Sequence, residues 1–306
     1  MPETIAHSMQ VARESGYGLS VINMTHAYCF RFGYVFAWPE THFTVKTEEL
    51  PDGAPNFSVE EVNAYDLMGR DDLAEIYNRD NDTVTGTAVR PTYLRSKHPG
   101  QESEPGYLFT DEHGEVAGYL FDGPPKPGQM YCHSDSAGDA EERLKVLGML
   151  ARRHGQKNVN FHRLPFQSDL AGLLRRLNCE MKVLYRRDGG YLIRIIDLAT
   201  TLEAMKGELS RRLSRSHLAG WQGELLVRAD DDEAALLIDR SEVNVIEGSS
   251  TLHRVEGDQH IAQLLVGTYP PLEIVRASGI SLSGEAEGLV EALFPEQWPQ
   301  MPNGDL

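Results

Sequence analysis

A mixed α/β and α+β fold in three regions is predicted by the order of helix-like and strand-like segments along the 306 residues. Up to about residue 188, amphipathic helices alternate with short apolar strands, which is typical of α/β layers. Beyond that point four strand-like segments follow one another with helices around them, which is an α+β pattern. A chain of this length exceeds one ordinary domain, so several units are expected.

The first region, residues 1–46, begins with a helix and continues into strands. The helix over 4–14 runs into Gly16, and an apolar strand is predicted at 18–24. A short aromatic-rich helix then leads through Phe32-Gly33-Tyr34 into another strand, and 41–46 is the closing strand. Residues 51–55, Pro-Asp-Gly-Ala-Pro, have the composition of a linker.

The second region, residues 57–188, has the elements of a complete α/β domain. Its longest helix is amphipathic, with Leu144, Leu147 and Leu150 on one face, and Ser168 is the expected cap of the next helix. The predicted elements are a strand at 59–67, a helix at 70–78, a hairpin over 106–121 with its turn at 111–114, a strand at 129–133, a helix at 139–154, a strand at 159–162, a helix at 169–177 and a strand at 181–186.

The third region, residues 189–306, is predicted to be an α+β domain. It opens with a strand at 191–196, and Asp197 is the expected cap of a helix that ends near residue 214. The remaining elements are strands at 223–229, 233–239, 242–247, 251–255 and 278–283, and helices at 258–266 and 285–293.

Composition restricts the partners and the compartment. The net charge of −17 argues against nucleic acid and anionic membranes, because a phosphate footprint needs a basic face. Cys29, Cys132 and Cys179 lack the spacing of zinc ligands, so we expect neither a metal site nor a disulfide framework. The sequence has neither the pattern of a signal peptide nor an apolar run of membrane-spanning length, so a reducing, cytoplasmic location is expected.

Common motifs for nucleophilic catalysis are not matched. Residues 279–283, Gly-Ile-Ser-Leu-Ser, miss the Gly-x-Ser-x-Gly pattern by one position. Cys132 and His133 are adjacent on a predicted strand, so their side chains diverge and cannot form a Cys–His pair. The chemistry is therefore sought elsewhere.

The chain resembles the Eis-type ("enhanced intracellular survival") acetyltransferases of the GCN5-related (GNAT) class along nearly its whole length. Arg31-Phe32-Gly33-Tyr34 matches the family's Tyr-x-Arg-Phe-Gly-Tyr segment, and residues 190–197 match the start of its C-terminal domain. Further matches are residues 263–267, residues 277–280, and the ending formed by residues 293–295 and 305–306. The resemblance implies half of an active GNAT domain at 1–46, a complete but degenerate GNAT domain at 57–188, and a sterol-carrier-protein-like domain at 189–306.

The resemblance also implies acetyl-CoA as the cosubstrate. Its pyrophosphate would bind at a helix N-terminus with the pattern Arg/Gln-x-x-Gly-x-Gly/Ala, where free amides and the helix dipole meet the anion. The first region is expected to start downstream of that motif, and the matching junction of the second region carries Asp135, Asp139, Glu141 and Glu142 instead. We therefore expect an N-terminally truncated relative that does not bind acetyl-CoA tightly.

Tyr28, Cys29 and Leu306 are the catalytic residues that the resemblance implies. The family's general acid is a tyrosine five residues before the last tyrosine of Phe-Gly-Tyr, and Cys29 holds that position with Tyr28 beside it. Either Tyr28 turns inward or the acid is lost. The C-terminal carboxylate, here that of Leu306, would be the general base. The alternative is that Tyr28, Phe30, Phe32 and Tyr34 are core aromatics.

The predicted activity is acetyl transfer from acetyl-CoA to a primary amine in a full-length parent, with the present chain inactive. A lysine-like or polyamine-like acceptor would suit the acidic charge. One alternative is a non-enzymatic binding module, with an apolar ligand in the third region or a scaffolding role. Another is a fragment without function. A homo-oligomer stays open.

Overall fold

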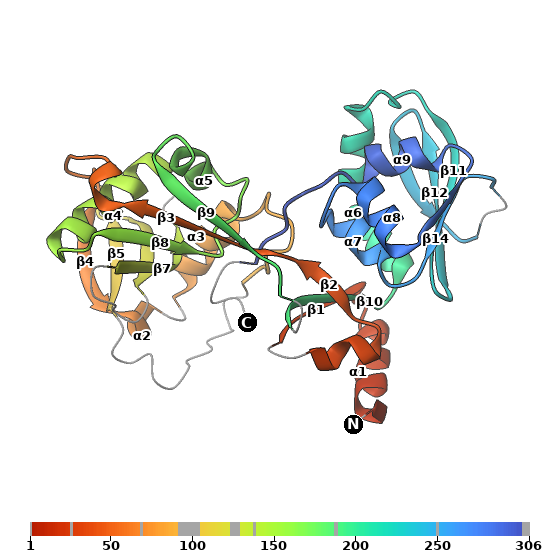
Figure 1. Ribbon diagram of the computed structural model, residues 1–306, viewed down its shortest axis with the longest axis horizontal. Coiled ribbons are helices and arrows are strands. Elements are labelled where there is room, and N and C mark those ends of the chain that lie inside the picture. The colour runs from red at the N-terminus through yellow and green to blue at the C-terminus, as the bar shows by residue number, and fades with distance from the viewer. Residues whose placement is uncertain are drawn as a thin grey trace. The chain divides into compact units, whose positions relative to one another are not determined.

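Two compact units make up the molecule, and each combines segments that are distant in sequence (Figure 1). The first unit consists of residues 1–39 and 185–298, and the second of residues 40–184 and 299–306. The computed structural model describes residues 2–24, 27–67, 70–90, 105–122, 129–136, 139–186, 189–248 and 251–301.

A three-stranded antiparallel sheet opens the first unit, in the order β1-β10-β2. Its outer strands are β1 (Leu19–Met24) and β2 (Val35–Trp38), and its central strand is β10 (Gly190–Ile195). The register pairs Ser20 with Arg194 on one side of β10 and Val35 with Ile193 on the other. The strand predicted to open the third region thus lies between two strands of the first region.

The helical segments beside this sheet are α1 (Pro2–Glu14) and the 3-10 helix η1 (Ala27–Phe32). Within the described part of α1, residues 4–14, a stripe of Ile5, Met9 and Ala12 is partly buried and the other side chains are exposed. Both segments end at a glycine with positive φ, Gly16 at +80° and Gly33 at +77°, a conformation that other residues adopt only with strain. Gly33 is therefore the residue that lets η1 turn directly into β2.

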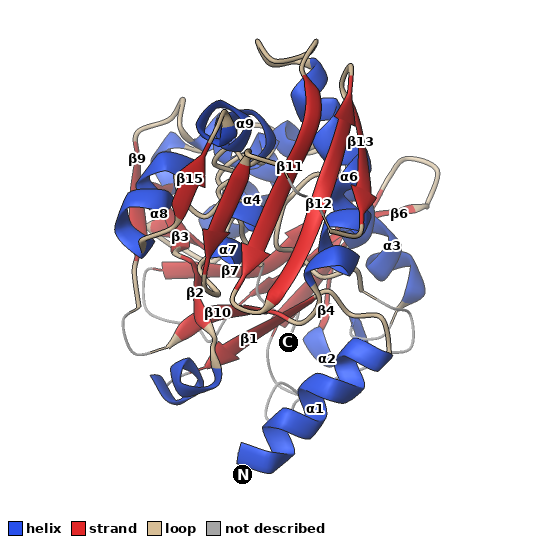
Figure 2. Ribbon diagram, turned by 90° about the vertical axis from the view of Figure 1, so that its right-hand side faces the viewer, coloured by secondary structure: helices blue, strands red, loops and turns tan. Residues whose placement is uncertain are grey.

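A five-stranded sheet with helices on one face completes the first unit (Figure 2). Its order is β13-β12-β11-β14-β15, and β11 and β14 run parallel while the other neighbours are antiparallel. Leu225, Leu236 and Leu213 are fully buried where this sheet meets the helices. The elements are α6 (Leu198–Ser214), β11 (Gln222–Ala229), β12 (Asp232–Asp239), β13 (Glu242–Ile246), β14 (Arg254–Gly257), α7 (Ile261–Val266), α8 (Pro271–Ser278), β15 (Ser281–Ser283) and α9 (Ala286–Leu293).

The second unit is built on a seven-stranded sheet in the order β4-β5-β6-β7-β8-β3-β9. Strands β7 and β8 run parallel, and the other neighbouring pairs are antiparallel. Its core includes Phe43, Leu120, Leu150 and Phe161. The elements are β3 (Glu40–Lys46), η2 (Thr47–Glu49), β4 (Ser58–Asn63), α2 (Ala64–Leu67), α3 (Asp71–Asp80), β5 (Pro105–Thr110), β6 (Val116–Asp122), β7 (Gln129–Ser136), α4 (Ala140–Arg153), β8 (Asn158–His162), α5 (Asp169–Leu174) and β9 (Cys179–Leu184).

The C-terminal segment that follows the first unit packs into the second. The amide of Gln300 donates to the carbonyl of Thr85, and its side-chain oxygen accepts from the Thr41 hydroxyl at 3.0 Å. The Gln300 side chain is 1% exposed and Met301 is 5% exposed. The tail is thus anchored as far as Met301, and Leu306 lies outside the described residues.

Several predicted boundaries differ from the structure, and in two places a helix replaces part of a predicted strand or the residues before it. The strand expected over 59–67 ends at Asn63 and gives way to α2. The strand expected over 278–283 begins at Ser281, because Ser278 ends the unpredicted helix α8, which starts with Pro271 at its first turn and stops at Gly279 with φ +69°. The three-domain boundaries stay predictions beside the two units. None of the helices in the described ranges is long and apolar enough to cross a membrane.

Candidate functional site

A hollow of about 510 Å³ lies in the first unit beside the turn from η1 to β2. One part of its lining is aromatic and apolar and comes from this turn: Phe30, Gly33, Tyr34, Val35 and Phe36. The other part is polar and comes from the loops around the five-stranded sheet: Asp230, Asp258, Gln259 and His260. The hollow therefore joins an apolar wall to an acidic one.

Tyr34 is the titratable group of the apolar wall. Its ring is buried with Cys29 and Leu192, and Met9 and Ile22 pack against that cluster. The Tyr34 hydroxyl lies 2.6 Å from the Ser20 hydroxyl across the sheet. Burial raises the pKa of Tyr34 above its ordinary value; the Ser20 hydrogen bond and the Arg194 charge oppose this rise, and Cys29 adds to it. The phenol therefore keeps its proton at neutral pH, and either hydroxyl of the Tyr34–Ser20 pair can be the donor.

The two carboxylates of the acidic wall are held by neighbouring donors. Asp258 accepts hydrogen bonds from the amide of His260 at 2.9 Å and from its ring at 2.7 Å. Burial alone would raise the pKa of Asp258, but these bonds and the His260 charge hold it below its usual value. Asp230 accepts from the Gln259 side chain at 3.0 Å, and the Gln259 oxygen accepts from the amide of Ile195 at 2.9 Å. Both anions are therefore fixed in position.

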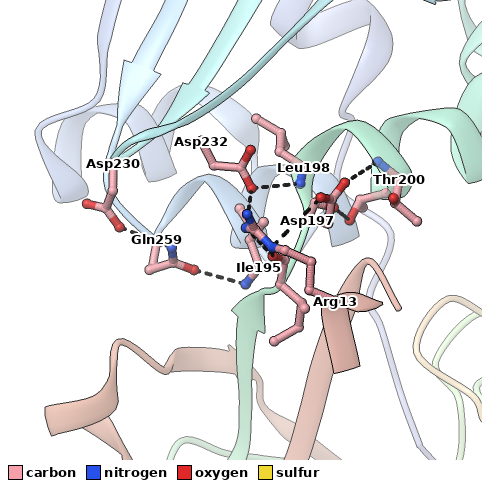
Figure 3. A network of polar contacts seen from close by, with 10 residues as sticks. Arg13, Ile195, Asp197, Leu198, Thr200, Asp230, Asp232 and Gln259 are labelled. Carbon is pink, nitrogen blue, oxygen red and sulfur yellow. Dashed lines mark hydrogen bonds and ion pairs between the residues drawn. The ribbon is translucent and has the colours of Figure 1, made fainter. Parts of the chain in front are cut away.

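A polar network connects the end of α1 to the start of α6 and to Asp232 on β12 (Figure 3). Arg13 donates to the carbonyl of Ile196 and to Asp232, at 3.1 Å, while Asp232 also accepts from the amide of Leu198 at 3.0 Å. Asp197 caps α6 by accepting from the amide of Thr200 at 2.7 Å, as predicted. The network ties the end of α1 to the start of α6 and to β12, next to the turn that carries Asp230.

The pyrophosphate pattern does occur in the first region, contrary to expectation, but in the wrong setting. Residues 13–18, Arg-Glu-Ser-Gly-Tyr-Gly, fit the letters, yet they join α1 to β1, whereas an anion cradle opens a helix. Arg13 is engaged in the network just described. Gly18 serves packing, since a Cβ there would lie 2.5 Å from the Thr201 hydroxyl. The turn at Gly16 and the close packing at Gly18 therefore explain both glycines without a bound phosphate.

The corresponding junction of the second unit satisfies its own amides. Asp139 caps α4 by accepting from the amides of Glu141 and Glu142. The Glu142 carboxylate accepts in turn from the Asn56 amide at 2.7 Å and from Lys145 at 2.6 Å. An incoming phosphate would meet two carboxylates and occupied donors. The side chain of Asp135 and residues 137–138 lie outside the described part of the chain.

The structure brings two of the three predicted catalytic residues close to the hollow. Cys29, 8% exposed, belongs to the Tyr34 cluster, and the half-buried Tyr28 packs against it. The Tyr28 ring lies edge-on to Phe32 at 5.2 Å between centroids, and Arg31 stacks on it at 4.5 Å. Neither Tyr28 nor Cys29 is among the described residues that line the hollow. Leu306 lies outside the described residues.

Sequence reasoning missed the residues of the acidic wall and treated Tyr34 only as a core aromatic. Tyr34 carried a usable signal, because it follows a glycine that forces a turn. Asp230 and Asp258 carried none, since acidic loop residues are common in a chain of charge −17. Within the described residues, no group of three or more His, Cys, Asp or Glu side chains could hold a metal ion.

Comparison with known proteins identifies the fold. No family model matches the chain. No curated protein matches it either. One solved structure of similar fold is a GCN5-related N-acetyltransferase from Anabaena variabilis ATCC 29413, with a TM-score of 0.73 and 17% sequence identity; the match covers 98% of this chain and 76% of that chain. Another is a GCN5-related N-acetyltransferase from Kribbella flavida, with a TM-score of 0.69 and 17% identity over 96% of this chain and 73% of that chain. Eis1 from Mycobacterium abscessus is also similar, with a TM-score of 0.66 and 16% identity over 98% of this chain and 77% of that chain. Along nearly all of its length, this chain has the mixed α+β fold of GCN5-related N-acetyltransferases.

Proposed function

We propose that the protein takes part in N-acyl transfer, in which the acetyl group of acetyl-CoA moves to a primary amine bound in the hollow. The shared fold supports acyl transfer as the reaction class. The observation that carries the proposal is the pairing of Asp230 and Asp258 with the wall of Tyr34 around about 510 Å³ of space. A primary amine is protonated at neutral pH, so two fixed carboxylates favour its binding, and the apolar wall suits its carbon chain.

Asp258 suits a role in binding the ammonium group. Its lowered pKa, the net result of the His260 contacts over burial, keeps it ionised at neutral pH and makes it a weak base. Tyr28 and Cys29 stay proposed proton-transfer residues, and the Leu306 carboxylate stays the proposed base. Deprotonation of the bound ammonium by that carboxylate or by water would free the nitrogen for attack on the thioester.

Weak binding of acetyl-CoA by these 306 residues is part of the proposal. The support is that Asp139 already bonds the amides of Glu141 and Glu142 at the start of α4. In residues 13–18, the amides of Ser15, Gly16 and Tyr17 already donate to backbone carbonyls, so they are not available to a pyrophosphate. Calorimetry is expected to give a dissociation constant above about 1 μM, which corresponds to roughly −8.2 kcal/mol. A tighter complex would overturn this part.

The test of the function is product formation at high acetyl-CoA concentration, where weak binding is overcome; the proposal differs here from the inactivity expected from the sequence. The protein is incubated with about 1 mM acetyl-CoA, well above the affinity limit just given, and with lysine or a diamine, and N-acetylated product is measured by mass spectrometry. The double variant Asp230→Asn/Asp258→Asn is expected to raise the KM for the amine by up to about thirtyfold, because each exposed ion pair contributes at most about 1 kcal/mol.

The matched control is Asp231→Asn, since Asp231 is an exposed neighbour of Asp230 outside the hollow. It is expected to leave the KM unchanged. Absence of acetylated amine with the unmodified protein would overturn the function. Product formation with an unchanged KM in the double variant would overturn the assignment of the hollow alone.

An apolar ligand in the third region has less support. Leu209, Leu225 and Leu293 are fully buried between the five-stranded sheet and its helices, so at these described positions the interior is filled by side chains.

A further inference from the structure

Three polar side chains form a row on one face of the three-stranded sheet: one from β1, one from β10 and one from the residue that precedes β2. Ser20 on β1 pairs directly with Arg194 on β10. Ile193 pairs with Val35 at the start of β2, so Tyr34, the preceding residue, falls opposite Arg194. Directly opposed residues in antiparallel strands share a face, so Ser20, Arg194 and Tyr34 lie side by side.

Hydrogen bonds join the two ends of this row and hold its middle residue. The Tyr34 hydroxyl reaches Ser20 two strands away at 2.6 Å. The Arg194 guanidinium donates to the carbonyl of Phe32, the last residue of η1. Arg194 also lies against Gly33, since its Cζ is 3.6 Å from where a Cβ of that residue would stand. Arg194 thus holds the turn from which Tyr34 extends.

The charge of Arg194 is directed toward this turn. Its Nε is buried without a hydrogen-bond partner among the described residues, and Arg194 forms no ion pair with a described carboxylate. The other titratable groups around Tyr34 are Cys29 and Tyr28 on η1, and Asp230, Asp258 and His260 on the opposite wall of the hollow. Arg194 is therefore the cation placed to stabilise a phenolate at Tyr34.

We infer that Tyr34, in place of Tyr28 or Cys29, is the proton donor of the site and that Arg194 is the residue that positions it, an inference that rests on the proposed function. Tyr34 lines the hollow, whereas the Tyr28 ring is covered by Arg31 and lies edge-on to Phe32. The amine nitrogen forms a C–N bond with the acyl carbon, and the C–S bond of the thioester breaks. The leaving thiolate takes the proton of the Tyr34 hydroxyl, and the phenolate is restored by one proton that the nitrogen loses. The second nitrogen proton passes to a base or to solvent.

The experiment compares Tyr34→Phe, Arg194→Met and Arg194→Lys with Tyr17→Phe, a control at a tyrosine that is 63% exposed. With acetyl-CoA and a diamine, Tyr34→Phe is expected to lower kcat by about 10²–10⁴-fold, the usual range for loss of a general acid. The KM for the amine should stay near its original value. Arg194→Met should lower kcat and shift the alkaline fall of the kcat–pH profile to higher pH. Arg194→Lys should partly restore kcat and the original profile.

A second measurement does not require turnover. The protein is labelled with ¹³Cζ-tyrosine, and Tyr34→Phe identifies the Tyr34 signal. Its titration midpoint is expected to move to higher pH in Arg194→Met, because the cation that stabilises the phenolate is gone, and to move less in Arg194→Lys. Circular dichroism shows whether each variant is folded; if Arg194→Met does not fold, Arg194→Lys decides the question.

The outcomes separate the two proposals. An active protein whose kcat is unaffected by Tyr34→Phe overturns this inference and leaves the proposed function standing. A Tyr34 signal that ignores both Arg194 variants overturns the positioning role. A protein without acyl transfer overturns the proposed function and the proton-donor role together, and the titration still decides whether Arg194 acts on Tyr34.

Discussion

The two units treat their charged loop residues differently. At the start of α4 in the second unit, Asp139 bonds the helix amides and Glu142 is bonded by Asn56 and Lys145, so the charges are consumed within the fold. In the first unit, Asp230 and Asp258 are also held by neighbours, yet they line an open hollow opposite Tyr34. Carboxylates that stabilise a helix end and carboxylates that face an open hollow look alike in sequence, and only the folded structure distinguishes them.

Burial also distinguishes helix α1 of the first unit from helix α4 of the second. Helix α4 has Leu147 and Leu150 almost fully buried, whereas Val11 on α1 is 45% exposed.

The largest expected effect is in amide hydrogen exchange. Amides of α1 should exchange orders of magnitude faster than those of α4, because a helix with one partly buried stripe opens at little cost while α4 opens only with its core. Exchange followed by mass spectrometry over peptides 4–14 and 143–153 checks this. Equal protection of the two helices would remove the contrast in stability.

Core truncation should give the next largest effect. Leu192→Ala, on the central strand of the small sheet, should cost about 2–5 kcal/mol of unfolding free energy, as should Leu147→Ala in α4. Both side chains are nearly inaccessible, at 0% and 2% exposed. Urea denaturation gives the loss of stability. Leu192→Ala should also impair acyl transfer by loosening Tyr34, whereas comparable loss of activity in folded Leu147→Ala would contradict the assignment of the site to the first unit.

Removing the cap of α4 should have a moderate effect. Asp139→Ala is expected to cost about 0.5–2 kcal/mol, since two amides of the first turn lose their acceptor. Thermal unfolding measures the loss, and the KM for the amine should not change. A changed KM would mean that the second unit contributes to the acceptor site.

The smallest expected effect is a loss of unfolding free energy at acidic pH. The pKa of Asp258 is lowered in the folded state, with the His260 contacts outweighing burial. Its contribution is therefore present above the unfolded pKa of about 4 and is lost as pH falls through the lower folded value. Asp258→Asn should weaken this dependence in urea titrations below about pH 4, while Asp231→Asn should leave it unchanged. An identical pH dependence in both variants would argue that the His260 contacts do not form in solution.

Local features of the fold were predictable from sequence, and distant pairings were not. Ser168 and Asp197 cap their helices as expected, and Asp111 closes the hairpin turn by accepting from the amides of His113 and Glu115. Each of these features depends on residues within a few positions. The pairing of β10 with β1 joins residues about 170 positions apart, and nothing in either strand specifies the other.

The candidate site shows the same limit. Gly33 indicates a turn in the sequence, so the position of Tyr34 after that turn was predictable. Strand register, which the sequence does not specify, places Ser20 and Arg194 beside Tyr34. The acidic wall depends on loops of the five-stranded sheet that come together only in the folded unit. Helix α8 was not predicted, although Pro271 stands at its first position, where proline is well suited.

The register Glu40 with Leu184, which joins the ends of β3 and β9, bears on how the molecule can be dissected. Directly paired residues are about 5 Å apart, so the chain leaves for the second unit and returns from it at neighbouring points. A protein that begins at residue 189 would leave Tyr191 and Ile193 without the strands that cover them. Replacing residues 40–184 by a two-residue hairpin turn instead would keep β1, β10 and β2 in one continuous polypeptide. Such a shortened protein would hold the hollow, the Ser20–Arg194–Tyr34 row and the Arg13 network in about half the length of the chain.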